Sequence, residues 1–220
     1  MSSISTGTID AAQRLRRAFW LKHLHQWHWI SSAICLIGML GFAITGFTLN
    51  HAGSIESHAS VTRREARLPD AVLRSFVEAR AQRDAKDKSG PVPAAAIDWL
   101  AREWSVDAGG RSGEWSADEV YVALARPGGD AWVSFDTGNG DVQYERTDRG
   151  VVAFLNDLHK GRNTGAAWSW FIDVFAAACL VFCVTGLFLL QLHAGGRAAT
   201  WPMVGLGIVI PVVLALLFIH

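Results

Sequence analysis

The sequence lacks charge over one long stretch, from His23 to Ile55, where none of the 33 residues is Asp, Glu, Lys or Arg. A bilayer has a hydrocarbon core about 30 Å thick, which roughly 20 apolar residues of helix can cross. The stretch therefore predicts a first membrane span over residues 27–49. Two later apolar runs predict further spans over residues 166–192 and 201–220, so the chain is expected to cross the membrane three times.

Cysteine is also scarce, and the three that occur, Cys35, Cys179 and Cys183, all lie within the apolar runs. The polar block between the first two spans has none, which excludes a disulfide framework there. This block also lacks a basic stripe, because it carries 15 Lys and Arg against 18 Asp and Glu between His51 and Gly165. That balance argues against nucleic acid as a partner. HExxH, flavin and Ser/His/Asp signatures are missing as well, so no catalytic residue is predicted.

Basic residues near the N-terminus predict how the chain is oriented in the lipid bilayer. Four Lys or Arg precede the first span in a short tail, and the positive-inside rule places such a tail in the cytoplasm. Residues 1–26 are interpreted as this tail with an interfacial helix. Residues 50–165 are then a domain outside the cytoplasm. Residues 193–200 form a cytoplasmic loop, and the C-terminus also lies outside.

The polar block changes its hydrophobic period along its length, from helical spacing to strict alternation and back. The elements that these patterns predict are helices over residues 69–88, 94–104 and 148–159 and strands over residues 119–125, 131–135 and 141–146. Glycine-rich turns between the strands have hairpin chemistry. The predicted fold class is an integral α-helical membrane protein of three spans with an extracytoplasmic α+β domain between spans 1 and 2.

Histidines stand at or near the ends of the first two spans. His25 and His28 open the first span and His51 follows it, while His159 precedes the second span and His193 follows it. Antiparallel spans would bring His51 and His159 to one surface of the membrane, and His25 or His28 with His193 to the other. Haem iron in an electron carrier takes two axial ligands from facing elements, and imidazole is a suitable one.

The histidine pairs therefore predict a haem b cofactor, with His51 and His159 as the first choice of axial ligands. His25, His28 and His193 are the candidates for the opposite surface. The alternative for each histidine is an anchor at the membrane–water boundary, where the tryptophans of this chain also gather.

Three further residues are weaker candidates. His58 and His220 lie on the predicted outer side, where His220 can compete as a ligand. Asp173 stands about two turns into the second span, where a carboxylate is costly and often functional. It is a candidate proton carrier, or a group that orients a ligand histidine.

The first two spans end alike, with Thr45-Gly46 closing one and Thr185-Gly186 closing the other, each three residues after a phenylalanine. The similarity indicates an internal repeat. Small residues at these points would let another helix, or a flat macrocycle, approach closely.

Two motifs carry a resemblance to a known family. They are Trp132-Val133-Ser134-Phe135-Asp136 with Thr137-Gly138, and Phe154-Leu155-x-x-Leu158-His159-x-Gly161 before a span. Together with the histidines of the first span, they make the chain similar to PepSY-associated transmembrane proteins over about residues 20–195. The larger members of that family have four spans or more, so three spans are a departure.

The resemblance implies a PepSY-like domain at residues 50–165. Some relatives resemble haem-containing ferric-siderophore reductases, which implies an electron carrier that reduces, or helps to reduce, a ferric siderophore or another periplasmic acceptor. A homodimer or a partner membrane subunit would complete the helical bundle. The alternative is a non-redox, membrane-anchored PepSY module that binds a periplasmic protein for assembly, inhibition or sensing.

Overall fold

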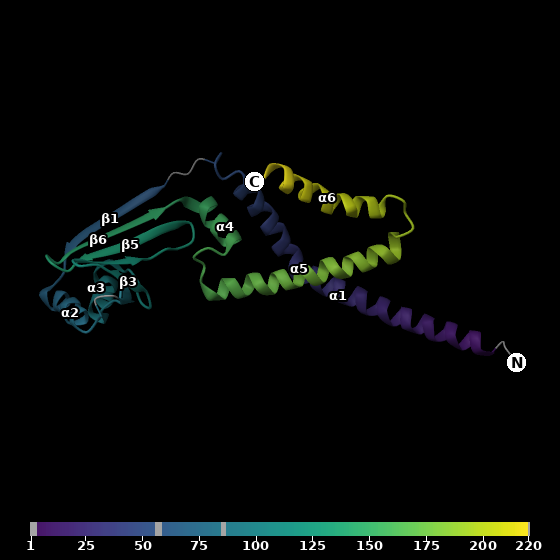
Figure 1. Ribbon diagram of the computed structural model, residues 1–220, viewed down its shortest axis with the longest axis horizontal. Helices are drawn as coiled ribbons and strands as arrows, with labels where there is room; N and C mark the ends of the chain where they lie inside the picture. The colour runs from purple at the N-terminus through teal and green to yellow at the C-terminus, as the bar shows by residue number, and fades with distance from the viewer. Residues whose placement is uncertain (1–3, 56–58, 85–86, 220) are drawn as a thin grey trace. The chain divides into compact units, whose positions relative to one another are not determined.

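The computed structural model describes residues 4–55, 59–84 and 87–219. The chain divides into two compact units, and each is described by itself. One comprises residues 1–42 and 170–220, and the other comprises residues 43–169. Helices α1, α5 and α6 supply the first unit, and a sheet with its helices forms most of the second (Figure 1).

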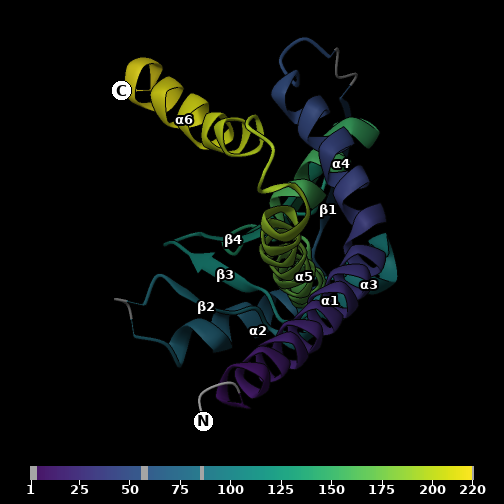
Figure 2. The ribbon, with the colours of Figure 1, turned by 90° about the vertical axis from the view of Figure 1, so that its right-hand side faces the viewer.

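Within the described residues, three helices are long and apolar enough to cross a membrane, in agreement with the predicted number of spans. They are α1 (Ile4–Asn50), α5 (Gly165–Ala194) and α6 (Thr200–Phe218). The chain is therefore a membrane protein. α1 runs for 47 residues without a break, about 70 Å, so it extends well beyond a hydrocarbon core of about 30 Å. No described residue of α6 is buried, and this helix leads away from the end of α5 through a short turn (Figure 2).

A six-stranded antiparallel sheet occupies the sequence between α1 and α5, with strand order β1-β6-β5-β4-β3-β2. Its strands are β1 (Ser60–Arg67), β2 (Ser89–Pro91), β3 (Ser112–Trp115), β4 (Glu119–Ala123), β5 (Gly129–Asp136) and β6 (Asp141–Asp148). Three helices accompany the strands: α2 (Asp70–Ala81), α3 (Ala94–Trp104) and α4 (Gly150–Lys160). The hairpins β4–β5 and β5–β6 arise where the Gly-rich turns predict them.

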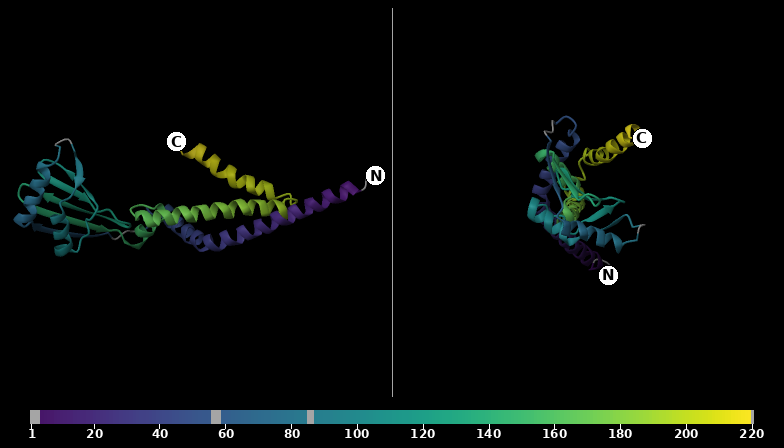
Figure 3. Two further views of the ribbon diagram at one scale, coloured as in Figure 1. Left: turned by 90° about the horizontal axis from the view of Figure 1, so that it is seen from below. Right: turned by 90° about the vertical axis from the view of Figure 1, so that its left-hand side faces the viewer.

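Helices α2 and α3 cover one face of this sheet, as Figure 3 shows. The opposite face, called the bare face below, is not covered by these two helices. The alternation along β5 explains why one face is covered. Ala131, Val133 and Phe135 point to that face and are buried, while the residues between them are only partly buried. Phe135 packs on Phe76 of α2 with ring centroids 4.9 Å apart, and both side chains are fully buried. The core of the domain therefore lies between the sheet and these two helices.

The predicted three-stranded sheet was too small, because β1, β2 and β3 were not expected. In β1 every residue except Ala66 is exposed, so the strand has no hydrophobic alternation to reveal it. Pairing with β6 defines β1, and an ion pair joins Arg63 to Glu145 of that neighbour at 2.7 Å. As an edge strand, β1 is protected by charge rather than by burial.

The helix predicted over residues 69–88 is shorter, because α2 ends at Ala81. Beyond Val77 the segment has no large apolar side chain that could pack on the sheet. Arg83 instead donates hydrogen bonds to the carbonyls of Asp87 and Ser89 and lies 5.0 Å from the ring of Trp115. The helix predicted over residues 94–104 is confirmed as α3.

Candidate functional site

Helices α1 and α5 pack antiparallel, and this packing brings histidines of the first unit together. His28 contacts Phe182 and Phe42 contacts Phe175, so residue numbers rise along α1 as they fall along α5. The approach is close at Gly38, where a Cβ atom would lie 2.4 Å from the Phe175 ring. Because residue 38 is a glycine, the ring of Phe175 on α5 can pack directly against α1.

His28 lies against the Thr-Gly pair of α5. Its Nδ1 is 3.0 Å from Thr185 Oγ1, its ring stacks on Phe182, and a Cβ on Gly186 would lie 3.3 Å from its Cε1. The Thr185 hydroxyl donates to the carbonyl of Val181 at 2.7 Å, so it accepts from His28 Nδ1–H. Thr185 thus engages Nδ1 of His28, and Nε2 is the ring nitrogen that this hydrogen bond leaves for another partner.

His25 of α1 and His193 of α5 meet directly. Their ring centroids are 5.5 Å apart with the planes at 87°, an edge-to-face contact between two exposed imidazoles. Each Nδ1 donates to a carbonyl one turn earlier on its own helix, His25 to Leu21 at 2.8 Å and His193 to Leu189 at 2.9 Å. Since a carbonyl only accepts, each Nδ1 carries a hydrogen, and Nε2 is the ring nitrogen that these bonds leave for another partner.

In the second unit, His159 at the end of α4 lies against the other Thr-Gly pair. Its Nδ1 is 2.8 Å from Thr45 Oγ1, and a Cβ on Gly46 would lie 3.4 Å from its Cε1. Thr48 donates to Asn156 Oδ1 at 3.0 Å, which adds a second bond between α1 and α4. The two Thr-Gly pairs therefore each receive a histidine from another helix.

His51 lies at the end of α1 and is exposed. Its Nδ1 donates to the carbonyl of Phe47 at 2.9 Å, and the two rings are 4.4 Å apart. His51 therefore bonds to Phe47 of its own helix, whereas His159 bonds to Thr45 of α1. Joint ligation by these two residues stays a prediction.

Of the three weaker candidates, Asp173 lies among the described residues. Asp173 is exposed on α5. His58 and His220 lie outside the described residues. Within residues 4–55, 59–84 and 87–219, no three His, Cys, Asp or Glu side chains form a group that could hold a metal ion. An iron inside a porphyrin needs at most two protein ligands, so this finding concerns other kinds of metal site.

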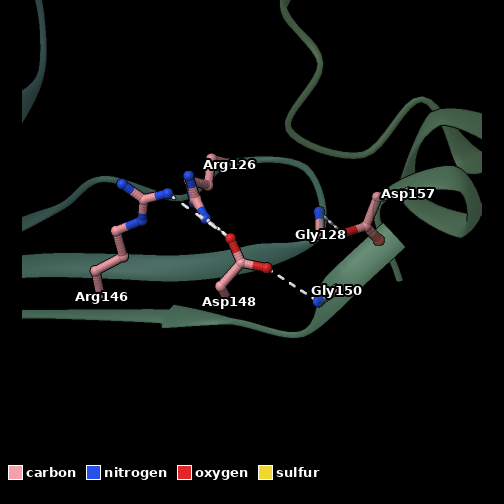
Figure 4. Close-up of polar contacts among 6 residues, drawn as sticks. All are labelled: Arg126, Gly128, Arg146, Asp148, Gly150 and Asp157. Carbon is pink, nitrogen blue, oxygen red and sulfur yellow. Dashed lines mark hydrogen bonds and ion pairs between the residues drawn. The ribbon is translucent and has the colours of Figure 1, made fainter. Parts of the chain in front are cut away.

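Helix α4, which carries His159, is held to the β4–β5 hairpin by a buried carboxylate (Figure 4). Asp157 Oδ2 accepts a 2.9 Å hydrogen bond from the backbone N–H of Gly128, and only 9% of Asp157 is exposed. On the other side of α4, the carbonyl of Leu158 accepts from the indole of Trp168 at 2.9 Å. Polar contacts therefore fix α4 at both the hairpin and the start of α5.

Gly128 is a position where a side chain would break this connection. Its φ is +74°, and a Cβ would lie 2.8 Å from the Cα of Phe154 and 2.9 Å from its backbone nitrogen. We expect Gly128→Ala to lower the free energy of unfolding of the sheet domain by about 2–3 kcal/mol, from left-handed strain and a clash with backbone. Denaturant unfolding of the full chain measures this. An unchanged midpoint, compared with Gly53→Ala, where a Cβ meets nothing within 4 Å, would contradict it.

Asp148 closes the other side of the same hairpin (Figure 4). The backbone N–H of Gly150 and the guanidinium of Arg126 lower the pKa of this carboxyl, and Arg146 lies 3.7 Å away. A lowered pKa in the folded state adds stability that is present above the unfolded-state value and is lost as pH falls through the folded-state value.

We therefore expect Asp148→Asn to destabilise the domain at pH 7, and we expect this loss of stability to shrink as pH falls below about 4. Denaturation midpoints of both proteins at pH 7 and pH 3 test the sign. An Asp148→Asn penalty as large at pH 3 as at pH 7 would show that the charge of this carboxylate is not what stabilises the hairpin.

From the sequence, Thr45 is expected to hydrogen-bond between helices, but its histidine partner and the matching role of Thr185 were missed. The signal was present in the repeated Thr-Gly pair, because a small residue beside a hydroxyl marks a place where a ring can approach a helix. What the sequence could not show was which histidine approaches which pair.

The donor chemistry that a haem would need occurs at one end of α1 and α5. His25 and His193 present two imidazoles from two facing helices, each with Nδ1 engaged by a carbonyl of its own helix. The ring centroids are 5.5 Å apart, and both rings are exposed at the same end of the helix pair.

Comparison with known proteins places the chain in a family. The model of the PepSY_TM-like family matches residues 19–220, which includes all three apolar helices from Phe19 onward and the sheet domain. No curated protein and no solved structure matches the chain. The sequence resemblance to PepSY-associated membrane proteins is confirmed, and the chain belongs to the PepSY_TM-like family.

Proposed function

We propose that this protein is a membrane electron carrier that holds haem b iron between His25 of α1 and His193 of α5. The observation that carries the proposal is the pair of facing imidazoles, 5.5 Å apart, from two membrane helices. Each has its Nδ1 engaged by a carbonyl of its own helix, which leaves Nε2 as the only ring atom that can take a metal.

The chain prepares these imidazoles in two ways. A hydrogen bond from Nδ1–H fixes the tautomer and raises the basicity of Nε2, as partners of metal-bound histidines do in other proteins. The bond also runs to the preceding turn of the same helix, so each ring keeps its orientation when the helices are fixed. Haem supplies one-electron exchange between ferric and ferrous iron when it is bound.

At the other end of the helices, His51 and His159 are proposed as a second ligand set. His159 is half-buried with its Nδ1 on Thr45, and His51 is exposed with its Nδ1 on Phe47. The basic tail of α1 supports a bacterial inner membrane with the N-terminus in the cytoplasm and the sheet domain and C-terminus in the periplasm. The electron acceptor is then a periplasmic ferric siderophore or another ferric chelate. A homodimer or a partner subunit would cover α6, which is exposed along its length.

An absorption spectrum of the purified full chain, made with ample haem, tests the proposal. We expect a Soret band and, after reduction with dithionite, sharp α and β bands. Addition of a ferric hydroxamate chelate should reoxidise the haem, so the α and β bands should disappear. A folded protein without haem absorbance would refute the carrier role. A reduced haem that the chelate does not reoxidise would refute the ferric acceptor only.

A second function is favoured by the bare face of the sheet. Tyr121 and Trp132 stack at its centre with ring centroids 5.9 Å apart. Burial and the nearby carboxylates of Glu114, Asp130 and Glu119 raise the pKa of Tyr121. An aromatic pair in a negative field suits a partner protein that presents lysine or arginine, so the domain would bind a basic periplasmic protein and the helices would anchor it.

This second function predicts a different response to mutation. Glu119→Gln with Asp130→Asn would weaken binding of the partner and would make that binding less dependent on salt. Replacement of the five candidate histidines at positions 25, 28, 51, 159 and 193 would leave the binding unchanged. Binding can be measured with a fluorescein-labelled lysine-rich peptide as the probe, with Asp70→Asn and Glu78→Gln on α2 as controls of equal charge. Equal weakening by both pairs of substitutions would refute a specific site on the bare face.

A further inference from the structure

A groove of about 350 Å³ opens between α1 and α5 in the helical unit. Phe19, Trp20, His23, Leu24 and Trp27 of α1 line it, together with Val181 and Thr185 of α5. The residues from α1 follow the spacing of one helix face, so a single stripe of aromatic and apolar side chains forms one wall.

Basic side chains stand directly before this groove on α1. At 100° per residue, Arg16 lies within about 40° of Trp20 and about 20° of Trp27, so it continues the same stripe toward the N-terminus. Arg17 flanks it. Both are exposed. No Asp or Glu occurs from Ala11 to Ile55, and the described ion pairs all join residues of the sheet domain.

The order along α1 is therefore a cation, then aromatic rings, then an apolar wall that continues onto α5. A phospholipid has the same order, with phosphate, glycerol region and acyl chain. Arg16 to Trp27 covers 11 residues, about 16 Å of helix, close to half of a hydrocarbon core of about 30 Å. The length matches one leaflet, and basic pockets beside membrane helices recognise anionic lipid headgroups.

We propose that this groove is a binding site for one anionic phospholipid, with its phosphate at Arg16 and Arg17 and an acyl chain along Trp20, Trp27 and Val181. The site differs from the pairing of His25 with His193 and does not depend on haem. Arg14 offers a matched comparison, because it has the same charge on the same helix but lies about 160° away from Arg16 around the axis.

Native mass spectrometry of the full chain in mixed micelles of phosphatidylglycerol and phosphatidylcholine tests the site. We expect the wild-type protein and Arg14→Gln to retain one phosphatidylglycerol in preference to phosphatidylcholine. Arg16→Gln should lower that preference about fivefold, the effect of one basic side chain near a membrane surface. Excess inorganic phosphate should not displace the lipid, because the acyl chain holds it in the groove.

Val181→Phe provides a second variant that keeps every cation and fills the apolar wall, and we expect it to lose the retained lipid. Circular dichroism would verify that each variant is still helical. The proposal is overturned if the wild type retains both lipids equally, or if Arg14→Gln lowers the preference as much as Arg16→Gln. It is also overturned if Val181→Phe retains phosphatidylglycerol as the wild type does, or if inorganic phosphate displaces it.

Discussion

His193→Ala is expected to remove the haem absorbance of the α1–α5 end, and His25→Ala is expected to do the same. Each substitution would delete one of the two proposed axial ligands. Loss of a mere hydrogen-bond partner of a metal ligand typically weakens metal binding 10–100-fold, so loss of the ligand itself should exceed about 100-fold. The measurement is haem content per protein together with the reduced spectrum, after purification of each variant from cells supplied with haem.

His23→Ala is the matched control for this experiment. His23 lies on α1 two residues before His25, and its ring packs against Phe19 with centroids 4.2 Å apart, so it is an imidazole of the same region engaged with an aromatic ring. Its removal should leave the bands of the His25–His193 pair in place. If the bands persist in His25→Ala and His193→Ala but vanish in His51→Ala or His159→Ala, the ligands are the outer pair instead.

His28→Ala separates ligation from packing. His28 Nδ1 is taken by Thr185, and its ring stacks on Phe182, so the side chain connects α1 to α5 whether or not it binds iron. A His28→Gln variant can keep a hydrogen bond to Thr185 but offers no imidazole. A haem content that is kept in His28→Gln but lowered in His28→Ala would indicate that His28 supports the packing of α1 on α5. Haem lost in both variants would make His28 a ligand.

The membrane helices could be predicted from the sequence because their signal is local. Uncharged runs long enough for a bilayer need no partner to be recognised, and the hairpins around β5 follow from glycine-rich turns and strict alternation. β1 could not be predicted, because its exposed charged residues carry no hydrophobic period and only the ladder to β6 makes it a strand. β2 and β3 are short, and they too are defined by pairing with neighbouring strands.

The histidine contacts depend on how helices cross, which sequence spacing does not determine. Counting turns indicates that His28 and His51 point about 140° apart on α1, but it does not say what lies opposite each ring. The structure sets His28 against Thr185 of α5 and His159 against Thr45 of α1. Each Thr-Gly pair thus contacts a histidine ring from another helix. The sequence indicated close approach at these pairs but not which ring approaches.

Phe135→Ala is expected to destabilise the sheet domain by about 3–5 kcal/mol, the usual cost of deleting a fully buried phenylalanine. Phe135 has no exposed surface, and its ring packs on Phe76 of α2, so truncation opens a cavity between the sheet and its covering helices. A domain of this kind has about 5–15 kcal/mol of stability in all, so the loss is a large part of it. Denaturant titration of the full chain in detergent, followed by fluorescence, gives the shift in midpoint.

Val61→Ala is the control, because Val61 lies on the edge strand with 51% of its surface exposed and should change stability by less than about 0.5 kcal/mol. The same variants also separate the two candidate haem ends. Helix α4 depends on the sheet through Asp157 and Gly128, so unfolding the domain should release His159 from Thr45. His25 and His193 belong to the helical unit, so haem held there should survive at denaturant concentrations that unfold the sheet domain of Phe135→Ala. Haem held by His51 and His159 should be lost as the domain unfolds.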